Sequence, residues 1–142
     1  MAKDNFYLEI ISPDGIQFTG DIESVTLPTL LGEITILPNH ASLSTKLVEG
    51  EIKIISSSKT THIAVSGGFF EITNNQGQVL SDFAIRAESI ELAKAEERKR
   101  EAEVKLSEKK DTFDTKIIER DIQRSILELK FGQNIKRRQK SQ

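Results

Sequence analysis

The sequence predicts an all-β first domain, a sandwich or barrel of antiparallel strands, followed by an α-helical hairpin. Before residue 87, short β-branched and aromatic runs alternate with turn residues, and this part holds all three prolines and seven of the eight glycines. After residue 87 the chain is rich in Ala, Glu, Lys, Arg and Leu and has no proline, which is typical of helices. We therefore expect two domains, residues 1–87 and residues 88–142.

Turn sequences mark the strand boundaries expected in the first domain. Pro13-Asp14-Gly15 and Asn74-Asn75-Gln76-Gly77 contain residues that tolerate positive φ or cap the backbone locally. Glu49-Gly50 and Gly67-Gly68 have the same chemistry, so hairpins are expected at these two positions as well. The runs expected as strands are residues 6–11, 16–19, 24–27, 34–37, 51–55, 61–65, 69–73 and 79–80.

Two helices with a thin apolar seam are expected after Ser89, and the polar segment from Ser107 to Thr112 is expected to be the turn between them. Because alanine buries little apolar surface, such a hairpin should be held together weakly. Two interpretations stay open, a hairpin packed permanently on the sheet domain and a detachable arm. The seam residues are Leu92, Ala95, Ala102 and Leu106 in the first helix and Ile118, Ile122, Ile126 and Leu129 in the second.

The composition limits the classes of function that the chain can have. The net charge is −2, but residues 1–87 hold 5 Lys and Arg against 10 Asp and Glu, whereas residues 88–142 hold 15 against 12. The absence of cysteine excludes disulfides, thiolate nucleophiles and cysteine-ligated zinc. The first residues do not have the pattern of a secretory signal, and no apolar run is long enough to span a membrane. We expect a soluble protein.

No combination of residues in the sequence predicts catalysis or a metal site. His40 lies in a turn-like context and His62 in an expected strand, with no metal-ligand spacing around either. Gly67-Gly68 lacks the Gly-Lys-Ser/Thr of a phosphate-binding loop. The basic cluster Lys136 to Lys140 has no interleaved aromatic residues and the chain is mildly acidic, so we expect it to face an acidic protein surface rather than nucleic acid.

Several motifs occur in a fixed order along the chain. They are Gly20-Asp21-Ile22-Glu23-Ser24-Val25-Thr26-Leu27-Pro28, Gly32-Glu33-Ile34, Ile36-Leu37-Pro38-Asn39-His40-Ala41, Ala64-Val65-Ser66-Gly67-Gly68-Phe69, Val79-Leu80-Ser81-Asp82 and Arg86-Ala87-Glu88-Ser89-Ile90. In this order they resemble the epsilon subunits of F-type ATP synthases, and the resemblance covers essentially the whole chain. Asn39 stands where the family usually has glycine, which is tolerable because asparagine accepts left-handed φ.

The resemblance implies a non-catalytic stalk subunit with a β-sandwich of about ten antiparallel strands. Such a sandwich is clamped between the gamma subunit and the ring of c subunits and couples proton flow to ATP synthesis. The turn containing Glu33 and the loop containing His40 are expected to face the c ring, and Ser12 is expected to face gamma. Membrane association would arise only through the complex, on the cytoplasmic face of a bacterial cell membrane or, as an alternative, on a chloroplast thylakoid.

The resemblance also implies that the helical hairpin is a regulatory arm with a folded and an extended state. In the extended state it reaches the alpha and beta subunits of the catalytic head and suppresses ATP hydrolysis. Cations of the second helix would then meet acidic loops of those subunits. The expected arm cations are Arg120, Arg124, Lys130, Lys136, Arg137 and Arg138.

Some bacterial members of the family bind regulatory ATP on the folded hairpin through an Ile/Leu-Asp-x-x-Arg-Ala motif and two arginines of the second helix. Here the motif positions hold Ile90, Glu91 and Lys94, with Glu in place of Asp and Lys in place of Arg. Arg120 and Arg124 are the candidates for the helix arginines. We therefore expect nucleotide binding to be weak or absent, and no cofactor.

A different class of function, a free-standing β-sandwich adaptor whose basic helical tail binds acidic partners or nucleic acid, is the alternative to a rotor subunit. It predicts salt-sensitive binding to nucleic acid and no association with an ATPase.

Overall fold

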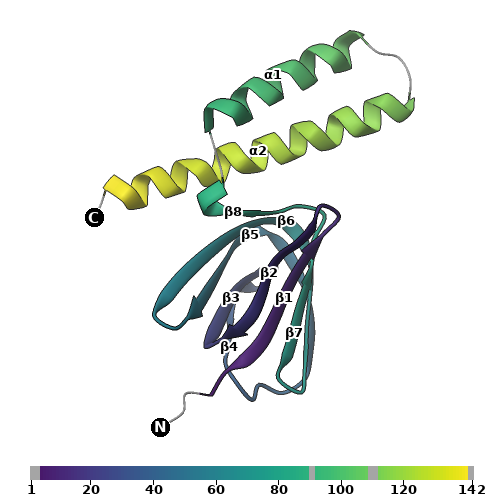
Figure 1. Cartoon of the computed structure of the whole chain (residues 1–142). Helices are drawn as coiled ribbons and strands as arrows, with labels where there is room; N and C mark the ends of the chain where they lie inside the picture. Colours follow the sequence, from purple (N-terminus) through teal and green to yellow (C-terminus); the bar gives the residue numbers. More distant parts are fainter. Residues whose placement is uncertain (1–3, 90–91, 109–111, 141–142) are drawn as a thin grey trace. The chain divides into compact units, whose positions relative to one another are not determined.

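The computed structural model describes residues 4–89, 92–108 and 112–140. The chain forms two compact units, Met1–Glu88 and Ser89–Gln142. The first unit contains the strands and the second the helices (Figure 1). The elements are β1 (Phe6–Ser12), β2 (Gly15–Ile22), β3 (Ser24–Thr29), β4 (Gly32–Ile36), β5 (Leu43–Ser56), β6 (Lys59–Thr73), β7 (Gln76–Leu80), β8 (Ala84–Arg86), a short 3₁₀ turn (Ala87–Ser89), α1 (Leu92–Glu108) and α2 (Thr112–Lys140).

The described residues contain eight strands rather than about ten, because β5 and β6 are long and continuous. The hairpins expected at Glu49-Gly50 and Gly67-Gly68 are wrong, since both pairs lie inside these two strands. Gly67 and Gly68 have φ of 114° and 130°, values that glycine adopts without steric penalty. The two glycines therefore let β6 continue through an irregular backbone conformation instead of ending it.

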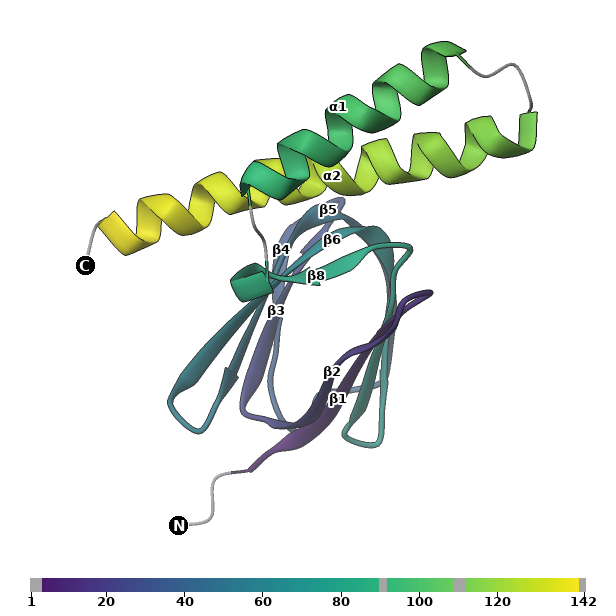
Figure 2. The same ribbon diagram turned by 45° about the horizontal axis from the view of Figure 1, so that its top comes forward.

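The strands form one sheet in the order β2-β1-β7-β6-β5-β3-β4, with β8 paired to β6. All pairings are antiparallel except that of β1 with β7, which is parallel. The sheet curls so that β1 and β2 lie across the interior from β3 and β4 (Figure 2). Ser56 Oγ donates a hydrogen bond of 2.9 Å to the carbonyl oxygen of Asp21, and Glu23 N donates one of 2.8 Å to Ile55 O. These bonds tie β5 to the β2 edge.

The core of the first unit follows from the two-residue period of its strands. In β1, Phe6, Leu8 and Ile10 are buried, while the residues between them are exposed or half-buried. Burying each large apolar side chain contributes roughly 1.5–3 kcal/mol, so this cluster dominates the stability of the unit. Every buried member of the main apolar cluster comes from residues 6–84.

The second unit is a hairpin in which α1 packs along α2. Ala95, Ala102 and Ile118 are buried, as the seam predicts, but the expected seam residue Ile126 is 44% exposed. The side chains of Ser125 and Glu128 are buried in its place. No helix within the described residues is long and apolar enough to cross a lipid bilayer.

Candidate partner-binding surfaces

An exposed row of apolar side chains crosses four neighbouring strands of the first unit. Ile16 of β2 pairs with Ile11 of β1, Ile11 with Leu80 of β7, and Leu80 with Phe69 of β6. Residues paired directly across strands share one face of the sheet. Ile16 is 60% exposed, Leu80 48% and Phe69 62%, so this row, the apolar ladder, is a continuous apolar strip open to solvent. Contiguous exposed apolar strips are typical of protein-binding surfaces.

Ser12, the residue expected to face gamma, lies at the end of the apolar ladder. It lines a shallow depression of about 430 Å³ together with Ile11, Pro13, Phe69 and Leu80. The Ser12 side chain is itself buried, and its Oγ accepts a hydrogen bond of 3.3 Å from Gln17 Nε2. Ser12 therefore forms part of the wall of the depression, and the ladder side chains present the apolar contact area.

Glu33, expected to face the c ring, lies near the start of β4 and is exposed. The turn that precedes it carries Leu30 and Leu31, which are 74% and 100% exposed. We call these two residues the leucine tip. Thr29, just before this turn, pairs with Leu47, and Leu47 pairs with Gly68. The turn therefore lies beside the row next to Phe69, the β6 end of the ladder.

His40 lies in the loop between β4 and β5, at the opposite end of β4 from Glu33. Three strand steps of ~3.3 Å carry the chain about 10 Å from Glu33 to Ile36, the last residue of β4, and His40 follows four residues later. Asn39 has φ of 65°, the left-handed conformation expected for it. Asn39 N donates to Asn75 Oδ1 at 2.6 Å, and Asn75 Nδ2 donates to Asn39 Oδ1 at 2.9 Å. The loop is thus pinned to the β6–β7 turn, and His40 Nδ1 lies 2.7 Å from Ala41 O.

The expected arm cations lie on α2. Arg124 Nε donates to Glu128 Oε1 at 3.3 Å, and Lys130 Nζ lies 5.7 Å from the ring centroid of Phe131. Arg120 is exposed. Arg124 therefore already has a carboxylate partner within its own helix.

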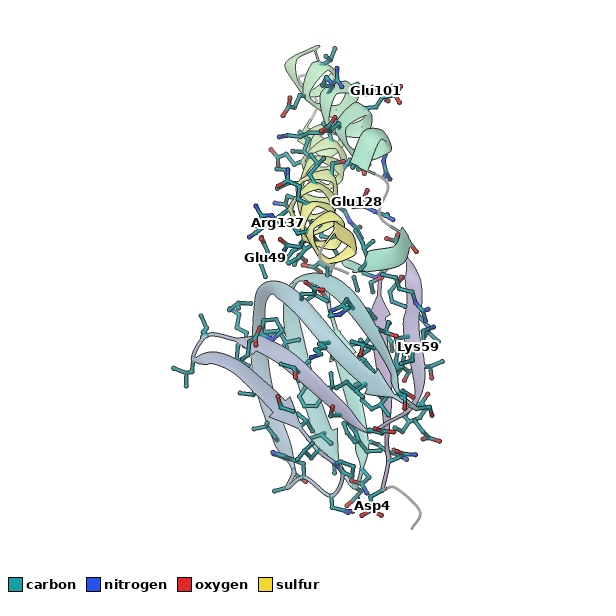
Figure 3. All side chains as sticks on the ribbon, turned by 90° about the vertical axis from the view of Figure 1, so that its left-hand side faces the viewer. Asp4, Glu49, Lys59, Glu101, Glu128 and Arg137 are labelled. Atoms are coloured by element: carbon teal, nitrogen blue, oxygen red, sulfur yellow. The ribbon has the colours of Figure 1, made fainter. Side chains whose placement is uncertain are left out.

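The basic cluster at the end of α2 is described in part. Arg137 is exposed and is labelled in Figure 3. The side chains of Lys136 and Arg138 lie outside the described residues. The backbone of all three is helical, so the cluster continues α2 rather than following it as an unstructured tail.

The expected nucleotide residues are not assembled into a site by the described part of the chain. Ile90 and Glu91 lie outside the described residues, and of Lys94 only the helical backbone is described. The guanidinium of Arg124 is directed to Glu128, and Arg120 lies one turn earlier on an exposed face. Residues 4–89, 92–108 and 112–140 also contain no group of three or more His, Cys, Asp or Glu that could hold a metal ion.

Sequence reasoning missed the apolar ladder, the leucine tip and the burial of Glu128. A signal for the ladder exists in the strands, because Phe69 and Leu80 alternate with the buried Phe70 and Val79 and must therefore point outward. The leucine tip is visible as two large apolar residues at an expected turn. Glu128 gives no such signal, since its burial depends on how the two helices are aligned.

Comparison with known proteins agrees with this architecture. Residues 5–87 match the family model described as ATP synthase, Delta/Epsilon chain, beta-sandwich domain. An ATP synthase epsilon chain of Endomicrobium trichonymphae is 40% identical over 133 residues, which cover 94% of this chain and 96% of the relative. One of Pelotomaculum thermopropionicum is 41% identical over 102 residues, covering 72% of this chain and 76% of the relative.

A solved structure shares the fold. A chain of the Euglena gracilis mitochondrial ATP synthase, in a structure of OSCP, F1 and the c ring, superposes with a TM-score of 0.59 at 20% sequence identity. The match covers 85% of this chain and 77% of that chain. The family model spans more than half of the sequence, and the two relatives are 40% and 41% identical over more than two thirds of this chain. The chain therefore belongs to the family of ATP synthase epsilon chains.

Proposed function

We propose that the first unit of this chain is the rotor joint of an ATP synthase, docked on gamma through the apolar ladder. As an epsilon chain of ATP synthase, the protein is a non-catalytic subunit, peripheral to the membrane as part of the complex. In the central stalk it couples proton flow through the c ring to ATP synthesis in the catalytic head. Its place in the cell is the cytoplasmic face of a bacterial cell membrane.

The apolar ladder is the observation that carries the docking proposal. Three of its side chains are 48% to 62% exposed, and a depression beside them offers a place for a partner side chain. Ser12, the expected gamma contact, lines this depression. Interface cores are enriched in such apolar and aromatic residues, whereas a free surface of this kind promotes non-specific association. A permanent partner in the stalk would cover it.

The c ring is the proposed partner of the turn that carries Glu33. The leucine tip extends this turn with two exposed side chains that have no apolar cover within the described chain. A contact that includes both Glu33 and His40 extends past the whole of β4, because Glu33 lies near its first residue and His40 lies in the loop after its last. The turn and the His40 loop therefore form two separate points of support on the ring.

The helical hairpin is the proposed inhibitory arm, which contacts alpha and beta when it is extended. Arg120, Arg137 and the neighbouring Lys136 and Arg138 supply the positive charge for acidic loops of these subunits. Arg124 contributes less than the sequence suggests, because the carboxylate of Glu128, one turn along the same helix, already offsets its charge.

The docking proposal is tested with Phe69→Ser and Leu80→Ser combined, using Leu37→Ser as the matched control. Leu37 is 57% exposed but lies at the His40 end of β4. Removing both ladder side chains should weaken binding to purified gamma by about 100-fold, because each loses roughly 1.5 kcal/mol of apolar burial. The measurement is a titration by calorimetry or surface plasmon resonance. Equal losses in the ladder variant and the control, or no loss in the ladder variant, would contradict the proposal.

A further inference from the structure

A buried carboxylate joins the two helices of the second unit. Glu128 of α2 is 3% exposed and is labelled in Figure 3. Arg98 Nη2 of α1 donates to Glu128 Oε2 at 2.6 Å, and Arg124 Nε of α2 donates to Glu128 Oε1 at 3.3 Å. Each carboxylate oxygen therefore accepts a hydrogen bond from a different guanidinium. We call these three residues the Glu128 clip.

The two bonds of the clip respond differently to opening of the hairpin. Arg124 and Glu128 are one helical turn apart, so their pairing persists in α2 whether or not α1 is present. Arg98 reaches Glu128 only when α1 lies against α2. The side chain of Arg98 is 48% exposed, whereas that of Glu128 is 4% exposed. Closing the hairpin therefore removes the carboxylate from water and supplies Arg98 in exchange.

On its α1 side, the described apolar seam around the clip consists of small residues. Ala95 and Ala102 are the described buried apolar residues of α1, and alanine contributes little burial energy. A buried charge that loses its partner is strongly destabilising, even where an intact pair adds little net stability. In a seam of this kind, the presence or absence of the Arg98 partner can decide whether the helices stay together.

The charges beside the clip are balanced. A depression of about 180 Å³ between the helices is lined by polar and charged side chains of both helices. Arg98, Lys105 and Arg124 face Glu101 and Asp121 there, and Glu128 adds the third carboxylate next to them. Two guanidiniums that converge on one point are the usual protein arrangement for holding a phosphate or carboxylate. Here the carboxylate of Glu128 occupies the position between the two guanidiniums where a bound anion would lie.

We propose that Glu128 is the built-in anion of the hairpin, closing α1 on α2 through Arg98 so that the folded arm needs no bound nucleotide. The clip uses Arg124, one of the two arginines that the family resemblance suggests for nucleotide binding. It leaves the depression without the excess positive charge that a triphosphate needs. The importance of closure for regulation rests on the proposed function, but closure itself is a property of the chain alone.

The test measures the ratio of open to closed hairpin in the full-length chain. Because the sequence has no cysteine, Glu103→Cys on α1 and Glu119→Cys on α2 place two spin labels at unique positions, and pulsed spin resonance reports the distance between them. Arg98→Gln leaves the buried carboxylate without its shorter bond, so the open fraction relative to the closed one should rise about 100-fold. Arg100→Gln, an exposed arginine two residues along the same helix, is the matched control and should leave the ratio within about twofold.

Two further measurements separate the clip from a general loss of helix. The combined Arg98→Leu and Glu128→Leu variant removes both charges and should return the hairpin to the closed state, because an apolar pair replaces the buried ion pair and Arg124, whose side chain is 39% exposed, stays in contact with water. Adding ATP with Mg²⁺ to the unsubstituted chain should leave the distance distribution unchanged. The proposal is overturned if Arg98→Gln behaves like Arg100→Gln, if the double leucine variant stays as open as Arg98→Gln, or if closure requires ATP.

The outcome is distinguishable from a failure of the proposed function. If Arg98→Gln opens the isolated chain but does not alter ATP hydrolysis in the assembled enzyme, the clip is supported and the inhibitory role of the arm is contradicted. If hydrolysis changes although the isolated hairpin stays closed, the clip is wrong and the arm acts by another route.

Discussion

Gly68, which precedes Phe69 of the apolar ladder, allows β6 and β7 to approach closely. Its φ is 130°, and a Cβ built there would overlap the carbonyl oxygen of Leu80 on the neighbouring strand. Gly15 has a similar φ of 121°, but a Cβ added there would meet nothing within 4 Å. The two glycines therefore share a conformational requirement, and at Gly68 close backbone approach is added to it.

Gly68→Ala should lower the free energy of unfolding by about 3 kcal/mol or more, because backbone strain and overlap with Leu80 add together. Gly15→Ala, the control, should cost about 1 kcal/mol from conformation alone. Urea denaturation of both variants measures the difference. Equal losses would mean that β6 and β7 can separate far enough to remove the overlap and that the close approach is not required.

For single residues, the sequence predicted which positions adopt an unusual backbone conformation, but not always whether that conformation ends a strand. The sequence predicts special backbone positions at Gly67 and Gly68, and both have positive φ, yet they lie inside a strand instead of ending one. Turn propensity describes one residue and its neighbours, while the pairing of β6 with β5, β7 and β8 is set by residues far along the chain. Asn39, judged by its own backbone preference, was predicted correctly.

At the scale of elements, the loop that carries His40 is fastened to another turn by one pair of side chains. Asn74 and Asn75 both have positive φ, 51° and 58°, in the β6–β7 turn. Asn75 exchanges two hydrogen bonds with Asn39, at 2.6 Å and 2.9 Å. Asn75→Gly should therefore reduce stability by about 1–2 kcal/mol relative to Asn74→Gly, because glycine satisfies the same φ in both variants.

Thermal unfolding gives this difference, and hydrogen exchange locates it. The amide of Asn39 should exchange faster in Asn75→Gly than in Asn74→Gly, since its acceptor is removed only in the first variant. If the two variants are equally stable and the Asn39 amide is equally protected, the loop is held by its own backbone and the side-chain pair is incidental.

In the helices, apolar spacing predicted some of the buried residues but not all of them. The sequence predicted two helices and several of their buried residues, including Ala95, Ala102 and Ile118. Ile126 was placed in the seam because it follows Ile118 by two steps of four. At about 100° per residue, however, eight residues rotate about 80° beyond two full turns. Ser125 lies within about 20° of Ile118 and is buried instead.

Glu128 lies on the opposite flank of α2 from Ile126, and there the partner helix supplies Arg98. A helix read alone treats Glu128 as a solvated partner of Arg124, one turn away. Only the alignment of α1 with α2 determines that its carboxylate is buried. Alignment depends on contacts between segments about 30 residues apart, which local patterns do not encode.

At the scale of the whole molecule, the change in composition near residue 87 coincides with the change from strands to helices. The first part carries the acidic excess and the second the basic excess. The order of motifs identified the family. The resemblance to that family then supplied information about which strands pair over long distances, which residue propensities do not contain. Neither source predicted the apolar ladder as a surface, since its four members come from four strands and meet only in the folded sheet.

The two units should be separable by truncation after Glu88. All buried members of the main apolar cluster lie within residues 6–84, so a fragment of residues 1–88 retains its own core and should unfold in one cooperative transition. It should bind gamma within about threefold of the full chain, because the apolar ladder lies wholly inside it.

In a reconstituted enzyme, the fragment should preserve coupled ATP synthesis but raise ATP hydrolysis, since the arm cations of α2 are missing. A fragment that folds and binds gamma while hydrolysis stays at the full-length level would leave the stalk role standing and contradict inhibition by the arm. A fragment that folds but fails to bind gamma would instead place the docking surface on the helices, against the ladder.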